Sequence, residues 1–273
     1  MAVISRITMQ KRNKDRLNIY LSKAGKEEFG FAVDQDVFVK YNLSKGLEIN
    51  EKEIKELIEE DEKKKTINLG LHYLSYRMRT VHEMTDYLEK KERQPEHIKA
   101  ALEKFKELGY LDDQAFASSY VRSKSATQIK GPMKLKQELK QKGVGQHVTE
   151  EAIDQFSEES EKELIQKWVD KQTRKTAKES RSKQKQKLYQ QLQGKGFSSG
   201  LIQEVLQDMD PAEEADEQQA LLFQAVKLER KYASKYTGKE YRLKMKQALY
   251  QKGFSVQLIE AYLDEHERED DET

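Results

Sequence analysis

The stretch GYLDDQAFASSYVRSKSATQIKGPMKLKQELKQKGV, residues 109–144, decides the fold of this chain. A Gly stands at its first position and again one residue before its end, and each Gly is followed by an apolar residue. Gly adopts left-handed backbone angles without a Cβ penalty, so it ends a helix and lets the next apolar residue fold back on the preceding turn. Asp112 and Pro132 are residues that open helices. The stretch therefore predicts short helices joined by tight turns.

This helix-ending signal recurs along the chain, at Phe105/Gly109/Tyr110, Leu139/Gly143/Val144, Leu192/Gly196/Phe197 and Leu249/Gly253/Phe254. Four helices that align with one another each carry two large apolar residues one turn apart, namely Met84/Leu88, Leu135/Leu139, Leu188/Leu192 and Met245/Leu249. A period of about 50 residues indicates a repeat architecture, in which neighbouring units stack because one unit buries too little apolar surface. We interpret these aligned helices as the second helices of three-helix repeats. Ser198 and Ser255 should cap the third helices of the last two.

The first 50 residues differ from the rest. Residues 3–8 and 17–21 alternate in the manner of strands, and residues 29–33 are a third candidate. Asp34 can cap a short helix that ends near Gly46. These features predict a small β-rich domain, which is too small to be stable unless it packs on the next helix.

The predicted fold class is mainly α, with tandem three-helix repeats forming a curved solenoid and a small β-rich N-terminal domain. The first helices of the repeats are expected over residues 66–78, 113–123, 162–178 and 211–236. A separate linker helix is expected over residues 51–63, capped by Asn50. The predicted parts are the N-terminal domain at 1–50, the linker and first repeat at 51–110, further repeats at 111–160, 161–209 and 210–266, and an acidic disordered tail at 267–273.

Composition excludes several classes of protein. The 273 residues include no Cys, which excludes a disulfide framework and suits a reducing compartment. The sequence has no apolar run near the ~20 residues of a membrane span and no signal-peptide core at its start, so we expect a cytoplasmic protein.

No pattern of catalytic residues emerges, and we expect no enzyme activity, no cofactor and no metal ion. The five His residues are scattered. Adjacent Asp112 and Asp113 suit a helix cap and dipole partner better than a metal pair. A nuclease or other phosphate-cleaving enzyme that uses these two residues is a weaker hypothesis. We interpret Trp168 as a core anchor of its repeat.

Charge is segregated although the net charge is only +1. The third helices are acidic and would be repelled by phosphate, whereas the second helices are rich in Lys. If the repeats stack in register, these cations form a stripe suited to an elongated acidic partner, although a solvated charged face is the alternative for any single Lys. The candidate binding residues are Arg122, Lys124, Lys130, Lys134, Lys136, Lys140, Lys142, Lys171, Arg174, Lys175, Lys178, Lys183, Lys187, Arg242, Lys244 and Lys246.

The central stretch also resembles a known family. The residues that carry the likeness are Tyr110, Leu111, Asp112, Asp113, Phe116, Ala117, Tyr120, Val121, Arg122, Gly131, Lys134, Leu135, Glu138, Leu139, Lys142, Gly143 and Val144, which resemble the signature of the RecX family of recombinase regulators. The later repeats and the β-rich start are similar to the longer, Gram-positive-type members.

The resemblance implies a monomeric, non-enzymatic modulator of RecA, with inhibition as the expected sign. Such a protein binds the RecA filament on single-stranded DNA in its helical groove and alters strand exchange, ATP hydrolysis and co-protease activity, and through them recombination and the SOS response. Its partners would be the RecA filament and single-stranded DNA, directly or through RecA, with double-stranded DNA as a further candidate. The alternative is a stand-alone helical-repeat protein that binds nucleic acid without RecA.

Overall fold

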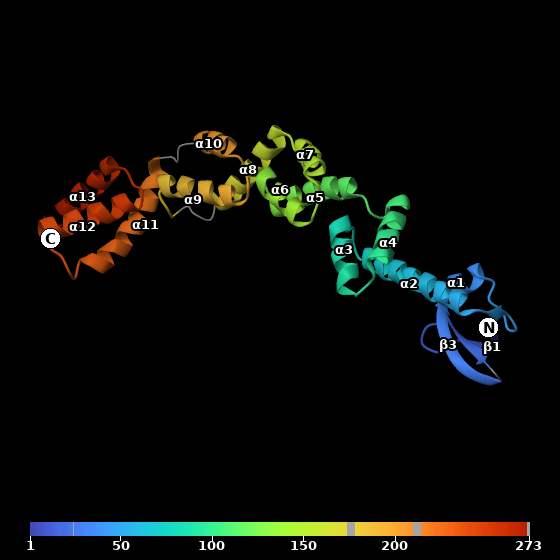
Figure 1. Cartoon of the computed structure of the whole chain (residues 1–273). Coiled ribbons are helices and arrows are strands. Elements are labelled where there is room, and N and C mark those ends of the chain that lie inside the picture. Colours follow the sequence, from blue (N-terminus) through green and yellow to red (C-terminus); the bar gives the residue numbers. More distant parts are fainter. Residues whose placement is uncertain (24, 174–177, 210–213, 272–273) are drawn as a thin grey trace. The chain divides into compact units, whose positions relative to one another are not determined.

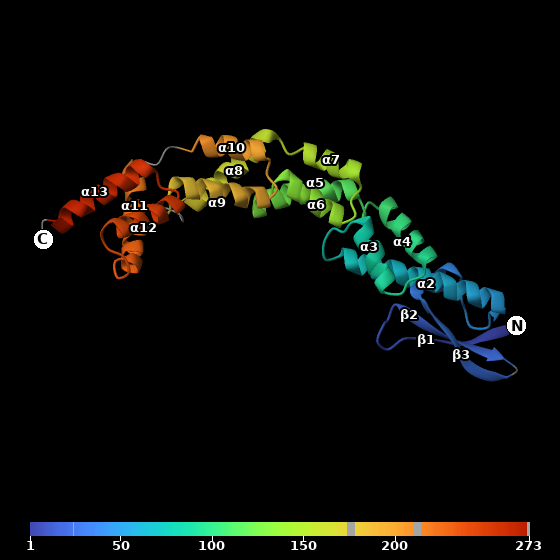
Figure 2. The same ribbon diagram turned by 60° about the vertical axis from the view of Figure 1, so that its left-hand side comes forward.

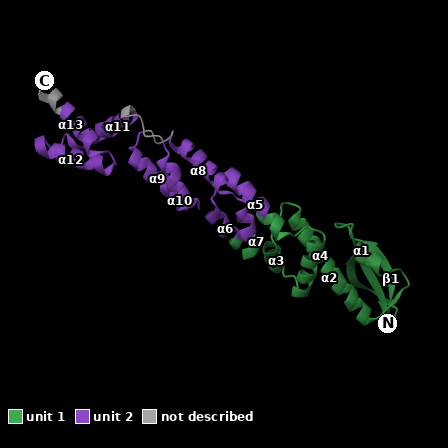
Figure 3. Ribbon diagram, turned by 90° about the horizontal axis from the view of Figure 1, so that it is seen from above, with its two compact units in different colours: residues 1–117, 140–148 green, residues 118–139, 149–273 purple. Residues whose placement is uncertain are grey.

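The computed structural model describes residues 1–23, 25–173, 178–209 and 214–271, apart from the side chains of residues 214–215 and 267–271. The chain forms two compact units, residues 1–117 with 140–148 and residues 118–139 with 149–273 (Figure 3). Each unit is described by itself.

An antiparallel sheet forms the start of the first unit (Figure 1). Its strands are β1 (Ala2–Met9), β2 (Arg16–Lys23), β3 (Lys26–Asp34) and β4 (Glu48–Ile49), in the order β3-β2-β1-β4. The three longer strands were predicted. The short β4 was not, because two residues carry no alternation, and it is fixed by pairing of Ile49 with Ala2 at the other end of the domain.

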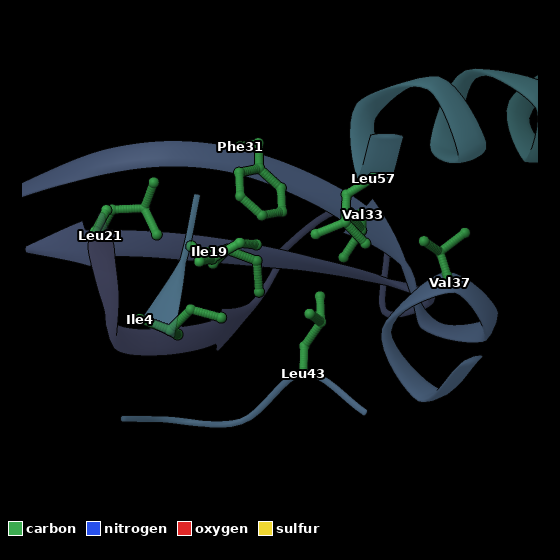
Figure 4. Close-up of a cluster of buried hydrophobic side chains, with 10 residues drawn as sticks. Ile4, Ile19, Leu21, Phe31, Val33, Val37, Leu43 and Leu57 are labelled. Atoms are coloured by element: carbon green, nitrogen blue, oxygen red, sulfur yellow. The ribbon is translucent and has the colours of Figure 1, made fainter. Parts of the chain in front are cut away.

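Helices cover one face of the sheet. Ile4, Ile19, Leu21, Phe31 and Val33 point from the strands into a common core (Figure 4). The helix α1 (Gln35–Lys40) adds Val37 and the start of α2 (Glu51–Leu74) adds Leu57. The small sheet thus packs on the following helix, as its size required. Asp34 caps α1 as expected, but α1 ends at Lys40, well before Gly46.

The helix α2 is continuous, where the sequence predicted a linker helix and a separate first helix. Asn50 and Glu53 form a capping box at its start. Its charged middle is held from both sides, because Arg16 of β2 lies 2.8 Å from Asp61 and Arg93 lies 3.0 Å from Glu62. These ion pairs stabilise helix in a segment that sequence reasoning treated as a boundary.

The first repeat combines the second half of α2 with α3 (Val81–Lys90) and α4 (Pro95–Glu107). Met84, Leu88, Ala101 and Phe105 are buried at its centre. The second helix of this repeat, α3, ends without Gly, and Glu92 instead takes the left-handed conformation at φ 55°.

Three further sets of helices follow (Figure 2). They are α5 (Asp113–Gln128), α6 (Pro132–Gln141) and α7 (Gln146–Asp154); α8 (Glu158–Thr173), α9 (Arg181–Gly194) and α10 (Ser199–Gln207); and α11 (Glu214–Tyr232), α12 (Gly238–Gln251) and α13 (Val256–Asp271). The last two sets each enclose a core, centred on Leu192 and on Leu249. The mainly α fold class, with three-helix repeats and an N-terminal sheet, is confirmed.

The helix bounds differ in places from the predicted ones. The helix α5 continues to Gln128 and α13 extends to Asp271, whereas the predicted end of α8 falls next to residues 174–177, which lie outside the described residues. The predicted start of the last repeat at residues 210–213 lies outside the described residues. The predicted domain limits and the disordered tail stay predictions.

The predicted helix ends are glycines with positive φ, between 71° at Gly109 and 89° at Gly253. Ser198 and Ser255 accept the capping hydrogen bonds expected of them. A helix, α4, ends at Gly109 as predicted, but the predicted folding of Tyr110 onto the core is wrong, because Tyr110 is 54% exposed. Leu111 is buried beside Phe105 instead.

Candidate functional site

Consecutive second helices meet end to end. In the second unit the C-terminus of α9 contacts the N-terminus of α6: the Gly131 N–H donates to the Lys195 carbonyl at 2.9 Å, and the Met133 N–H donates to the Gly196 carbonyl at 3.0 Å. The fit leaves no room for side chains, since a Cβ on Gly196 would lie 2.3 Å from the Lys134 backbone nitrogen. We call such a contact a joint.

The same joint occurs twice more. Between α12 and α9, Ser180 Oγ donates to the Lys252 carbonyl, and a Cβ on Gly253 would lie 2.7 Å from Ser180 Oγ. In the first unit, Thr80 Oγ1 at the start of α3 donates to the Lys142 carbonyl at 2.7 Å. A Cβ on Gly143 would there lie 2.3 Å from the His82 Cβ.

Helix chemistry explains why the joints form. The last carbonyls of a helix and the first N–H groups of another lack partners within their own helices, and the two ends carry opposite partial charges. Each joint brings such ends together: N–H groups donate to the carbonyls in the α9–α6 joint, and the hydroxyls of Ser180 and Thr80 donate in the other two. The Gly that ends one helix permits the close approach. The sequence predicted these glycines as local helix ends, but their second role as contact points had no local signal.

Many candidate cations are paired with acidic residues of the same molecule. Lys130 contacts Glu138 at 2.6 Å, Lys142 contacts Glu83 at 2.8 Å, and Arg242 contacts Glu260 and Asp264. We call Lys136, Lys187 and Lys246 the acid-paired cations, because they contact Glu150, Glu179 and Glu260 respectively. Part of the charge segregation therefore serves contacts within the later repeats and, at Lys142 and Glu83, a contact between two repeats.

Other candidate cations face neutral groups. Lys134 and Lys183 donate to Gln137 and Gln186, at 3.4 and 2.9 Å, and Lys244 lies 5.6 Å from the centre of the Tyr236 ring. We call these three the neutral-facing cations. Lys124 and Lys178 lie over the rings of Tyr120 and Phe223, and Arg122, Lys140 and Lys171 are exposed. Arg174 and Lys175 lie outside the described residues.

Two of the paired acids have displaced pKa values. Burial alone would raise the pKa of Glu83, but hydrogen bonds from Arg77 and Lys142 outweigh it and hold the pKa at about 2. Burial likewise opposes a lowered pKa at Glu138, where hydrogen bonds from Lys130 and Tyr120 prevail. Both carboxylates stay ionised at neutral pH and neutralise the cations beside them.

The adjacent carboxylates serve the backbone, as their interpretation as a cap predicted. Asp112 Oδ1 accepts the N–H groups of Gln114 and Ala115, both at 2.9 Å, at the start of α5. Asp113 Oδ1 accepts the Val81 N–H at 2.9 Å. Within the described residues, no three His, Cys, Asp or Glu side chains are grouped so that they could hold a metal ion.

Trp168 differs from its prediction as a core anchor. It is half-buried at the edge of the core of α8, α9 and α10, and its Nε1 donates to Gln191 Oε1 at 3.3 Å. The Nζ of Lys195 lies 4.1 Å from the centre of the indole. Lys195 was absent from the candidate residues, and its place beside the indole depends on the packing of α8 on α9.

No helix in the described part of the chain has the length and apolar character needed to cross a bilayer.

Models of RecX domains match most of this chain. The model of the regulatory protein RecX N-terminal domain matches residues 2–50, and the models of the first and second RecX three-helix domains match residues 67–105 and 112–153. The model of the third RecX three-helix domain matches twice, at residues 159–206 and 215–263.

Individual relatives and solved structures are also RecX proteins. Regulatory protein RecX of Halalkalibacterium halodurans is 47% identical over 97% of this chain and 100% of its own, and that of Bacillus subtilis is 40% identical over 98% and 100%. A crystal structure of regulatory protein RecX covers 76% of this chain and 100% of its own, at 36% identity and a TM-score of 0.63. A crystal structure of RecX from Lactobacillus salivarius covers 55% of this chain and 97% of its own, at 30% identity and a TM-score of 0.52. The chain belongs to the RecX family of regulatory proteins.

Proposed function

We propose that this chain regulates the RecA recombinase and inhibits it by binding the RecA filament on single-stranded DNA. Family membership supports regulation of RecA in general. Binding along the filament groove, the inhibitory sign, a monomeric state and a cytoplasmic location are the finer parts of the proposal. The protein acts as a binding partner and performs no chemistry itself.

The observation that carries the proposal is the joint. We infer that the joined helices of the second unit, α6, α9 and α12, present their cations at repeating positions, which would match acidic groups repeated along a filament. Periodic matching lets several weak contacts act together, since each further contact forms within an already bound complex. The neutral-facing cations are suited to this role because their hydrogen bonds and ring contacts in the described part of the chain are with Gln137, Gln186 and Tyr236, although the charge of Lys134 also acts on Glu138.

Inhibition of RecA is the result expected when one chain bridges several RecA protomers. A chain that contacts several RecA protomers at once favours the filament geometry it binds best, and it opposes the movements of protomers that accompany ATP turnover. Contacts to the bound strand also compete with the incoming DNA substrate, which reduces strand exchange.

Neutralising Lys134, Lys183 and Lys244 together tests the proposal. The triple Lys→Gln variant should bind RecA filaments more weakly and inhibit RecA ATPase less. If the three contact phosphates of a single strand, the slope of log affinity against log salt should fall by about 2, at ~0.7 per contact. The matched control replaces the acid-paired cations Lys136, Lys187 and Lys246 with Gln. Equal loss of inhibition in the two variants would refute the assignment to the neutral-facing cations.

The alternative, a nucleic-acid-binding protein without a RecA partner, is supported by the aromatic and basic groups around Trp168. Capture of RecA in the absence of DNA separates the two functions. Binding of RecA alone supports regulation through direct contact, whereas binding of DNA with no effect on RecA at any concentration supports the alternative.

A further inference from the structure

The only Trp of the chain lies in α8 beside Lys195, and the charges of two further lysines, Lys130 and Lys171, act on Lys195. Lys195 follows α9, Lys130 lies between α5 and α6, and Lys171 lies one helical turn after Trp168. The joint brings the first two together, since the Gly131 N–H donates to the carbonyl of Lys195.

The Lys195 ammonium has weak compensation for its charge. It lies 4.1 Å from the centre of the indole and 3.4 Å from the Gln128 carbonyl, and no carboxylate contact with it is recorded among the described residues. Burial, followed by the positive charges of Lys130 and Lys171, lowers the pKa of this ammonium. Like charges held close together are destabilising, and an anion placed among them relieves that repulsion.

One acidic residue, Glu138, offsets part of the positive charge of these lysines. Glu138 contacts Lys130 at 2.6 Å and accepts a hydrogen bond from Tyr120. It therefore offsets one of the three charges. The charges of Lys171 and Lys195 remain.

We propose that Trp168, Lys130, Lys171 and Lys195 form a binding site for single-stranded nucleic acid, in which the lysines hold phosphates and the indole stacks on a base. This deepens the proposed function, on which it rests for its biological role, by naming one place where this chain contacts the strand directly. Bases in a duplex are already stacked on one another, so an indole platform favours a single strand. Lys195 has a flexible side chain that can leave the indole for a phosphate, which opens the ring face it covers.

The single Trp makes the site its own reporter. Intrinsic fluorescence of the full-length protein is titrated with an oligothymidylate of about 8 nucleotides, without RecA. Saturable quenching is the expected result. Absence of quenching, or equal quenching by a duplex of the same length or by polyglutamate, would overturn the proposal.

Variants locate the effect, with binding followed by anisotropy of a labelled oligothymidylate. Trp168→Ala should bind about 5- to 150-fold more weakly, as expected for loss of one stacked base, and Trp168→Phe should retain most of the affinity. Lys195→Gln should lower the slope of log affinity against log salt by about 0.7. Lys167→Gln is the matched control, because Lys167 adjoins Trp168 but pairs with Glu163. An effect of Lys167→Gln equal to that of Lys195→Gln would refute the site.

Circular dichroism of each variant guards against misfolding. If Trp168→Ala loses helicity, Lys195→Gln and Trp168→Phe decide the question, since both are smaller changes: Phe keeps an aromatic ring, and Gln keeps a polar side chain without the charge. RecA ATPase is measured separately. Oligothymidylate binding at Trp168 with no effect on RecA supports this site and rejects the proposed regulation, whereas inhibition of RecA with no binding at Trp168 does the reverse.

Discussion

Replacing Gly196 with Ala should open the joint between α9 and α6. Gly196 has φ 86°, and its added Cβ would lie 2.3 Å from the Lys134 backbone nitrogen and 2.6 Å from the Lys134 Cβ. Neither atom is the end of a flexible side chain, so the two helix ends must separate. Separation breaks the hydrogen bonds from Gly131 to Lys195 and from Met133 to Gly196.

Gly109→Ala is the control for the loss of unfolding free energy in Gly196→Ala. Gly109 has φ 71°, and a Cβ there would meet no atom within 4 Å, so Gly109→Ala carries only the left-handed penalty of about 1–2 kcal/mol. Gly196→Ala carries that penalty and loses two hydrogen bonds worth about 1 kcal/mol each. The reduced entropy of the unfolded chain affects both variants alike. The expected difference is therefore about 2 kcal/mol.

Two measurements test this difference. Urea denaturation gives the change in unfolding free energy for each variant. Hydrogen exchange at the Met133 amide, which reports the joint directly, should become roughly 30-fold faster in Gly196→Ala, as 2 kcal/mol of local opening requires. Equal destabilisation by the two variants, or an unchanged Met133 exchange rate, would refute the idea that the joint depends on the missing Cβ.

Three further predictions concern stability. Glu92→Gly should stabilise the first repeat by up to about 1 kcal/mol, because Glu92 adopts φ 55°. Its control, Glu103→Gly within α4, should destabilise the protein by about 1 kcal/mol, and urea midpoints that shift in the same direction for both variants would contradict the prediction. Since the pKa of Glu83 falls from 4.5 to about 2 on folding, its stabilisation is complete above about pH 4.5 and is lost as pH falls toward 2. Glu83→Gln should therefore make the thermal midpoint less sensitive to acid across that window, and an unchanged pH profile would count against it. Leu192→Ala, at a fully buried position, should cost about 2–5 kcal/mol in urea denaturation, and a cost below 1 kcal/mol would contradict the described core.

Local chemistry made part of the fold predictable. A Gly after a helix, an Asn before one and two apolar residues one turn apart act over a few residues, so the helix ends, the Asn50 cap and pairs such as Leu188 and Leu192 could be read from sequence. The short β4 and the continuity of α2 could not. The first depends on pairing of Ala2 with Ile49, and the second on the pairing of Arg16 with Asp61.

The candidate site was less predictable, because its contacts also join residues that are distant in the sequence. The sequence indicates which helices are basic, but the partner of each cation comes from another helix. Lys136 pairs with Glu150, for example, whereas Lys134 on the same helix donates to Gln137. Trp168 and Lys195 come together only through the packing of α8 on α9.

Site-directed crosslinking tests the central claim, that the second helices carry the binding surface, most directly. The chain has no Cys, so a photoreactive group can be attached at single positions. The account predicts crosslinks to RecA or to its DNA strand in assembled filaments from Lys183→Cys on α9 and Lys244→Cys on α12. Gln203→Cys on α10 and Glu265→Cys on α13, which are exposed on acidic third helices, should give few. Crosslinks mainly from Gln203→Cys and Glu265→Cys would contradict it.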